Sequence, residues 1–284
     1  MQNFSVDLLH LLTLNVGFAS HHADWNWKHV RSPFARLYYV TEGSAKIELP
    51  SGIHNLRPDH LYFIPPFTMH SYICDGMFSH YYIHIYEDQQ GETGMLEDWE
   101  YPVETAATPA DLQLVKRLCE MNPRMRLPQS DPETYDNHST LIGNIQRNLE
   151  RPFSDKVESR GILFILFSRF LQQAVPKNKV TDSRIEQTMA YVRKNFSQRI
   201  DLNTLADIAC LSKDHFIRMF KKEVGQTPTS YIIGKKIERA ELMLVTTALP
   251  VKQIAMSLGY DDFAYFNRQF KLKTGLTPLQ YRGR

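Results

Sequence analysis

About the last hundred residues contain one pattern twice, and this duplication decides the fold. Residues 202–231 read LNTLADIACLSKDHFIRMFKKEVGQTPTSY, and residues 251–281 read VKQIAMSLGYDDFAYFNRQFKLKTGLTPLQY. At an offset of 50, the following residues recur: Phe216, Arg218, Phe220, Lys221, Gly225, Thr227, Pro228 and Tyr231 match Phe266, Arg268, Phe270, Lys271, Gly275, Thr277, Pro278 and Tyr281. Upstream the offset is 49, so that Cys210 matches Gly259. Shared residue types at fixed spacing predict two copies of one supersecondary unit.

Each copy has the features of two short helices joined by a tight turn. In the first copy, residues 202–209 predict one helix, and Ser212 is the expected cap of a second helix that buries Phe216 and Phe220. In the second copy, Gly259 is expected in the turn and Asp262 at the cap. This order predicts a helix-turn-helix, whose second helix fits the DNA major groove.

The exposed faces of these two second helices carry candidate DNA contacts. Arg218 and Arg268 are the best candidates for reading guanine, because a guanidinium can bridge O6 and N7. The lysines further along each helix suit phosphates. The predicted DNA-binding residues are Lys213, Asp214, Ile217, Arg218, Lys221, Lys222, Ala264, Tyr265, Asn267, Arg268, Lys271 and Lys273. The alternative is that these are ordinary solvated helix faces.

Between the two copies, residues 229–245 predict one helix. A helix of this length spans roughly 25 Å. Such a spacer suits two reading helices about one DNA turn apart, so that a single chain reads two half-sites.

The charge distribution separates the two ends of the chain. Residues 181–284 hold 17 Lys and Arg against 10 Asp and Glu, a net charge of +7, and residues 1–180 hold 16 against 21, a net charge of −5. A basic C-terminal domain favours a polyanionic partner such as double-stranded DNA, although an excess of this size also arises by chance.

The N-terminal part carries strand signals instead. Residues 45–49 alternate apolar and charged side chains, and residues 36–41, 61–64 and 81–85 are rich in aromatic and β-branched residues. Short breakers separate these segments, which is typical of a barrel or a sandwich. We expect a small barrel because the strands are short.

Helices are predicted after the strands, at residues 109–121, 137–150 and 154–173, the last capped by Ser154. The apolar residues of the last helix cover too much of its circumference for a helix with one side exposed to solvent. The helix is therefore expected either in the subunit core or against a second subunit. The fold class is therefore α+β with two domains. The predicted divisions are 1–106, a β-barrel; 107–176, helices that could dimerise; 177–181, a linker; and 182–284, tandem helix-turn-helix units.

Composition excludes several other classes. The hydrophobic fraction of 43% suits folded domains, and no apolar run reaches the length of a membrane helix. Three scattered cysteines do not form a disulfide framework or a CxxC pair. The N-terminus lacks the basic start of a secretory signal, so a cytoplasmic location is expected.

Histidines are frequent in the strand region. His80, Tyr82 and His84 share one strand face, and His70 lies nearby in sequence. Together with Tyr38, these four are the candidate effector-binding residues. An HxH pair followed by Glu is missing, so no metal and no other cofactor is predicted, and no catalytic constellation is found. The alternative is a metal-binding enzyme with His70, His80 and His84 as ligands.

The duplicated region resembles the AraC/XylS family of bacterial transcription regulators. The matching segments are residues 201–206, 211–222, 225–228, 236–240, 254–260, 266–271 and 275–282. Lys236 stands where the family usually has Arg. Asp214 and Ile217 stand at positions that often contact bases, although neither is a typical reader of guanine or phosphate.

The N-terminal half resembles the family's cupin-like sensor barrel through residues 37–43 and 61–70. Phe67 replaces the glycine that usually precedes a histidine such as His70 by a few residues. The resemblance implies a small effector in the barrel, sugar-like or aromatic given the many aromatic residues, and a dimer formed by the helices that follow.

The sequence therefore predicts a DNA-binding transcription regulator controlled by a small molecule, and not an enzyme. The resemblance favours an activator, which would also contact RNA polymerase, and no membrane partner is expected. Two alternatives stay open: a metal-binding cupin enzyme fused to a DNA-binding domain, and a constitutive regulator whose barrel is filled by side chains.

Overall fold

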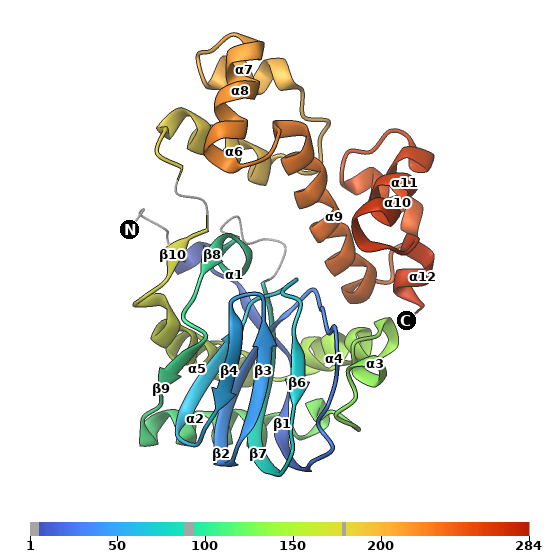
Figure 1. Cartoon of the computed structure of the whole chain (residues 1–284). Coiled ribbons are helices and arrows are strands. Elements are labelled where there is room, and N and C mark those ends of the chain that lie inside the picture. The colour runs from blue at the N-terminus through green and yellow to red at the C-terminus, as the bar shows by residue number, and fades with distance from the viewer. Residues whose placement is uncertain (1–5, 88–93, 178–179, 284) are drawn as a thin grey trace. The chain divides into compact units, whose positions relative to one another are not determined.

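The computed structural model describes residues 6–87, 94–177 and 180–283. The chain divides into two compact units, Met1–Val175 and Pro176–Arg284 (Figure 1). The division lies next to the predicted linker, residues 177–181, of which 178 and 179 lie outside the described residues.

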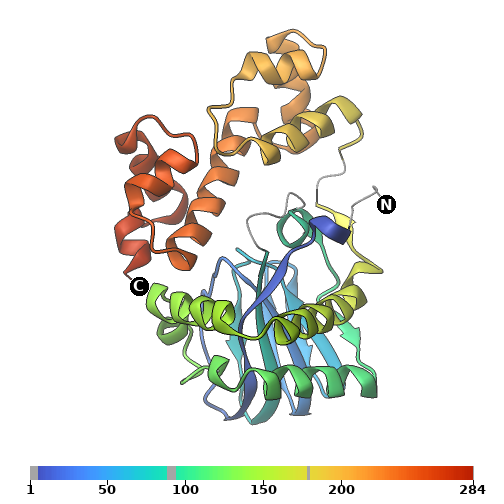
Figure 2. The same cartoon turned by 180° about the vertical axis from the view of Figure 1, so that it is seen from behind.

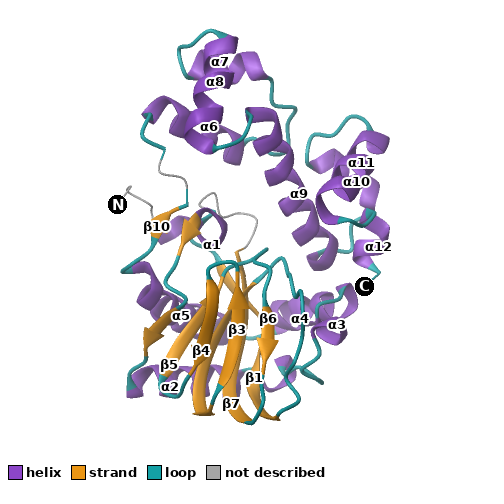
Figure 3. Ribbon diagram, viewed as in Figure 1, coloured by secondary structure: helices purple, strands orange, loops and turns teal. Residues whose placement is uncertain are grey.

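Most of the strands precede the helices in the chain, and Figure 3 shows the strands gathered in the first unit. The strands are β1 (Leu11–His22), β2 (Ala35–Gly43), β3 (Ala45–Leu49), β4 (Gly52–Leu56), β5 (His60–Ile64), β6 (Ser71–Ile73), β7 (Met77–Glu87), β8 (Trp99–Glu100), β9 (Glu104–Ala106) and β10 (Val175–Pro176). They form a five-stranded sheet in the order β1-β7-β2-β5-β9, a three-stranded sheet β4-β3-β6, and the short pair β10-β8. The predicted α+β, strand-rich first domain is confirmed, but its strands form separate sheets and not one closed barrel.

The chain passes from the large sheet to the small one at Gly43. Its φ of +73° lies in the left-handed region, and a Cβ there would lie 1.9 Å from the carbonyl oxygen of Met77. Glycine is therefore required at this crossing. After this crossing, β3 pairs with β4 and β6 in the small sheet.

Both faces of the large sheet are buried, and alternation along β2 divides its side chains between two cores. Tyr38 and Val40 face the small sheet, where they join an aromatic cluster with Trp25. Leu37 and Tyr39 face the opposite way. That side is covered by helices, which lie across the sheet in Figure 2.

The helices of the first unit are α1 (Met95–Asp98), α2 (Pro109–Met121), α3 (Pro132–Tyr135), α4 (His138–Glu150) and α5 (Phe153–Leu171), with 3-10 turns at Val6–Leu8 and Pro123–Met125. Phe167 and Phe170 of α5 pack on Phe63, with ring centroids 5.5 and 5.3 Å apart. The wide apolar arc therefore belongs to the core of the unit. The predicted cap, Ser154, is wrong: Pro152 occupies the cap position, and the Ser154 hydroxyl donates to Asp155.

The second unit consists of α6 (Ser183–Lys194), α7 (Leu202–Ile208), α8 (Lys213–Val224), α9 (Pro228–Thr246), α10 (Val251–Ser257), α11 (Phe263–Thr274) and α12 (Pro278–Arg282). The predicted spacer helix, residues 229–245, corresponds to α9, which spans roughly 28 Å. Thr227 caps it, and Pro228 suits its first turn because that position needs no N–H donor.

Candidate DNA-binding surface and effector pocket

The second helix-turn-helix unit is built from α10, a tight turn and α11. Gly259 in the turn has a φ of +67°. Asp262 then caps α11, because its carboxylate accepts hydrogen bonds from the amides of Ala264 and Tyr265 at 2.7 and 3.1 Å. Phe266 and Phe270 are fully buried, so α11 turns its opposite face to solvent.

The first helix-turn-helix unit repeats this arrangement with α7 and α8, except that Ser212, at the predicted cap position of α8, makes no side-chain hydrogen bond to the helix. Cys210 stands at the position of Gly259 and also has a positive φ, +52°. The ring of Phe220 meets that of Tyr231 edge-on at 5.6 Å, and Phe270 meets Tyr281 edge-on at 5.5 Å. The repeated residues therefore make the same aromatic contact behind α8 and behind α11, and this contact fixes which face of each helix is left outside.

The predicted DNA-binding residues fall on these outer faces with two partial exceptions. Ile217 and Asn267, at equivalent positions of α8 and α11, are half-buried, and Ile217 packs against the core of its own unit. The others are exposed: Lys213, Asp214, Arg218, Lys221, Lys222, Ala264, Tyr265, Arg268, Lys271 and Lys273.

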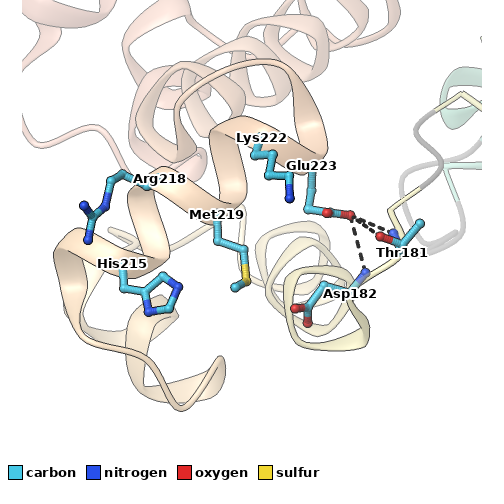
Figure 4. Close-up of a pocket in the computed structure, with 7 residues that line it drawn as sticks. All are labelled: Thr181, Asp182, His215, Arg218, Met219, Lys222 and Glu223. Carbon is cyan, nitrogen blue, oxygen red and sulfur yellow. Dashed lines mark hydrogen bonds between the residues drawn. The ribbon is translucent and has the colours of Figure 1, made fainter.

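A surface hollow of about 460 Å³ lies beside α8 (Figure 4). Its lining includes Arg218 and Lys222 from the predicted set, together with His215, which the sequence reasoning did not select. On the other side of the hollow, the Glu223 carboxylate accepts hydrogen bonds from the amide and hydroxyl of Thr181 at 2.7 and 2.9 Å. The segment that enters the second unit is thus attached to the last turn of α8.

The first unit holds a cavity of about 230 Å³ at the sheet face that carries the histidines. It is lined by Phe18, Ala19, Ser20, His21, Asp24, Trp25, Tyr38, His80, Tyr82, His84, Leu127, Pro128, Gln129, Ser130 and Tyr135. Of the predicted effector residues, Tyr38, His80, Tyr82 and His84 line this cavity. His70 is not part of the lining. Its Nε2 lies 2.8 Å from the Tyr72 hydroxyl, and its Nδ1 lies 2.8 Å from the Thr68 carbonyl oxygen.

His21 and Trp25 are lining residues that the sequence reasoning did not select. His21 lies on β1, which pairs with β7, so its ring stacks on that of His80 at 5.5 Å. The period-two alternation of β1 places His21 on a definite face, but only the pairing with β7 shows that this face is the cavity wall.

The cavity histidines are held in the neutral form. Burial lowers the pKa of His80 and of His84 well below the usual value of 6.5, and burial also lowers the pKa of His21. The His21 Nδ1 lies 3.3 Å from Asp24, so the neutral ring keeps its proton there and leaves Nε2 as an acceptor. Within the described part of the chain, His21 Nε2 and His80 Nδ1 have no hydrogen-bond partner. The cavity wall therefore offers unused hydrogen-bonding capacity.

Two of the three ligands required by the metal alternative, His70 and His84, are engaged in separate contacts. His84 Nδ1 lies 3.2 Å from the Asn15 amide, and His70 is bound to Tyr72 and Thr68. Among the residues that the structure describes, no three His, Cys, Asp or Glu side chains are grouped as a metal would require. Likewise, none of the described helices is long and apolar enough to span a membrane.

Two curated proteins and one solved structure illustrate what the chain resembles. The MmsAB operon regulatory protein of Pseudomonas aeruginosa is 38% identical over 95 residues, which are 34% of this chain and 31% of that protein. The xylose operon regulatory protein of Escherichia coli is 32% identical over 103 residues, 36% of this chain and 26% of that protein. The C-terminal domain of AraT, a response regulator from Geobacillus stearothermophilus, is 31% identical, with 37% of this chain and 87% of that one covered and a TM-score of 0.36. The chain thus spans about a third or less of the length of these curated relatives.

Two family models match the chain, one in each unit. A model described as an AraC-like ligand binding domain matches residues 15–96, and one described as a helix-turn-helix domain matches residues 205–284. The first match contains most of the cavity-lining strand residues, and the second contains both α8 and α11. On these matches the chain belongs to the AraC/XylS family, with an AraC-like ligand-binding domain followed by an AraC-type helix-turn-helix domain.

Proposed function

We propose that this protein is a sequence-specific, DNA-binding transcription regulator controlled by a small molecule, and that it has no catalytic activity. One observation carries the proposal: Arg218 and Arg268 occupy equivalent exposed positions on two helices whose opposite faces are buried by phenylalanines. A merely solvated helix face gives no reason to repeat an arginine, whereas two recognition helices that read similar half-sites do.

Titration of the full chain against a duplex from its own promoter region, with a scrambled duplex of equal length, tests the proposal. We expect preference for the promoter duplex and a linear fall of log K with log salt, since phosphate contacts release counterions. The double variant Arg218→Ala/Arg268→Ala should lose the preference, whereas Lys46→Ala, an exposed lysine of β3, should keep it. Absence of salt-dependent affinity for every promoter duplex would contradict the proposal.

We further propose that the effector binds in the 230 Å³ cavity. Aromatic side chains and neutral imidazoles that lack partners suit a ligand with a flat or apolar face and hydroxyl groups, of the sugar-like or aromatic kind. A cavity of this size among the side chains also argues against a purely structural role for the first unit. A thermal-shift screen of monosaccharides and small aromatic compounds tests this, because a bound ligand raises stability by mass action.

A homodimer through α4 and α5 is the proposed assembly. Leu149, Phe153 and Val157 are 65, 80 and 54% exposed, and they border a mainly apolar groove of about 520 Å³. Apolar residues gathered in this way mark interaction surfaces. Sedimentation velocity of the wild type and of Phe153→Glu tests the dimer. As an activator, the protein would also contact RNA polymerase, and it would act in the cytoplasm, where bacterial DNA lies.

A further inference from the structure

The ammonium group of Lys236 joins the two helix-turn-helix units. Lys236 lies in α9 and is 5% exposed. Its Nζ donates to the carbonyl of Gln198, which precedes α7, at 2.8 Å, and to the carbonyl of Leu258, which follows α10, at 2.6 Å. One side chain on the spacer helix α9 thus holds one backbone segment from each helix-turn-helix unit.

The same two segments also touch each other directly. A Cβ at Gly259 would lie 2.5 Å from the carbonyl carbon of Gln198, so only a glycine permits this approach at the turn. The Lys236 Nζ lies 5.4 Å from the ring centroid of Tyr260, and an exposed ion pair at 3.9 Å joins Arg199 to Asp261 at the rim. Contacts from both helix-turn-helix units therefore converge on the Lys236 amine.

The chemistry of this site suits a link better than it suits a titrating switch. Burial lowers the pKa of Lys236 to about 8, with Asp261 opposing the shift. An ammonium has three donors and a neutral amine has two, which still matches the two carbonyls. Both hydrogen bonds can therefore persist in either protonation state, whereas an apolar side chain would leave both carbonyls without this donor.

We propose that Lys236 is a positioning residue that fixes the two helix-turn-helix units relative to each other and so sets how α8 and α11 meet successive stretches of one DNA. The proposal rests on the DNA-binding function proposed above. Two helix-turn-helix units with a fixed relative orientation bind DNA as one preorganised body. Two units that move independently lose conformational entropy on binding, which lowers the affinity for DNA.

Spin labels test the link in the full chain without DNA. One label is placed on native Cys210, which is exposed in the first helix-turn-helix unit. The other is placed on Leu272→Cys, an exposed position of α11 outside the predicted DNA-binding set. Cys74 and Cys119 are buried and stay unlabelled. We expect a narrow distance distribution in the wild type, a broad one in Lys236→Met, and recovery in Lys236→Arg. The matched control is Lys235→Met, because Lys235 pairs with Glu238 on the same helix.

DNA titration of the same variants gives a second readout. Lys236→Met should weaken binding to the promoter duplex by about tenfold or more, with an unchanged salt slope, because the buried amine does not touch phosphate. Removal of a phosphate contact would instead lower that slope by about one unit.

Failure of the wild type to bind DNA would defeat the proposed function, while the spin-label distances would still decide the role of Lys236. Circular dichroism checks the fold of each variant. If Lys236→Met is unfolded, Gly259→Ala separates the same segments from the other side and should also broaden the distribution. A distribution as narrow as that of the wild type in the folded variant overturns the proposal.

Discussion

The carboxylate of Glu223, in the last turn of α8, holds Thr181 through both the amide and the hydroxyl of that residue. The Asp182 amide approaches the same oxygen at 3.4 Å. The chain that leads into the second unit is therefore bound to the C-terminal end of a helix proposed to read DNA. A change in the course of this segment would act on α8 directly.

Acid should release this attachment. Hydrogen bonds from Thr181 lower the pKa of Glu223 below its usual 4.5, so the ionised form is the one that the folded state favours. Its contribution is complete above about pH 4.5 and is lost as the pH falls through the lower folded-state pKa. The protection factors of the Thr181 and Asp182 amides, each taken relative to the intrinsic exchange rate at the same pH, should fall in Glu223→Ala and, in the wild type, on acidification, whereas Glu186→Ala on α6 should leave them unchanged. Equal protection at Thr181 in wild type and Glu223→Ala would show that the carboxylate does not hold the segment.

Substitutions at two positions of α11 should distinguish base recognition from phosphate contact. Arg268→Ala should cost about 1–3 kcal/mol on the specific duplex and relax the preference at one or two base pairs. Lys273→Ala, in the last turn, should weaken specific and scrambled DNA alike and lower the salt slope by about one unit. Titrations at several salt concentrations measure both. Equal loss on both duplexes for Arg268→Ala would remove it as a base reader.

Effector binding should not change between pH 7 and 8. Burial lowers the pKa of His80 and His84 well below 6.5 and also lowers the pKa of His21, so the neutral form of all three cavity histidines predominates throughout this interval. Any ligand found by thermal shift should therefore show the same dissociation constant at both pH values, and His80→Phe should abolish its effect while His54→Ala, outside the cavity, should not. Tighter binding at pH 7 than at pH 8 would mean that an imidazolium takes part.

Substitution of two phenylalanines of α5 should affect different properties, the stability of the fold in one case and the oligomeric state in the other. Phe167 is fully buried against Phe63, so Phe167→Ala should lower the free energy of unfolding by about 3–5 kcal/mol. Phe153→Glu, at an 80% exposed position, should leave stability nearly unchanged and shift sedimentation towards the monomer. A stable dimer of Phe153→Glu would place the interface elsewhere.

Alkaline pH should stabilise the fold through Lys236. Its folded-state pKa of about 8 lies below the usual 10.5, so between these values the unfolded chain binds one proton more. The free energy of unfolding, measured as wild type minus Lys236→Met, should therefore rise from pH 8 to 10, by at most about 1.4 kcal/mol per pH unit. Chemical denaturation at each pH gives this difference. A flat difference would mean that the amine is solvated in the native state.

Local patterns were enough to predict the second unit. Its helices follow from caps such as Asp262, from the proline after Thr227, and from phenylalanines four residues apart, all of which act within one or two turns of the chain. Because the pattern occurs twice, the outer face of each reading helix was predictable as well. The strands of the first unit were also recognisable, since their alternation is local.

Contacts between distant residues decided the rest. Two separate sheets stand in place of the expected barrel, and the chain crosses between them at Gly43, which approaches Met77 across 34 positions of sequence. His21 lines the cavity and His70 does not, because strand pairing and the Tyr72 hydroxyl determine their neighbours. Lys236 looks like a conservative departure from arginine in the sequence, and only the packing of two segments around α9 gives its amine two carbonyl partners. Periodicity tells which side of an element is apolar, but the partner of that side is selected by the packing of the whole unit, where burial and unsatisfied polar groups carry their full energetic cost.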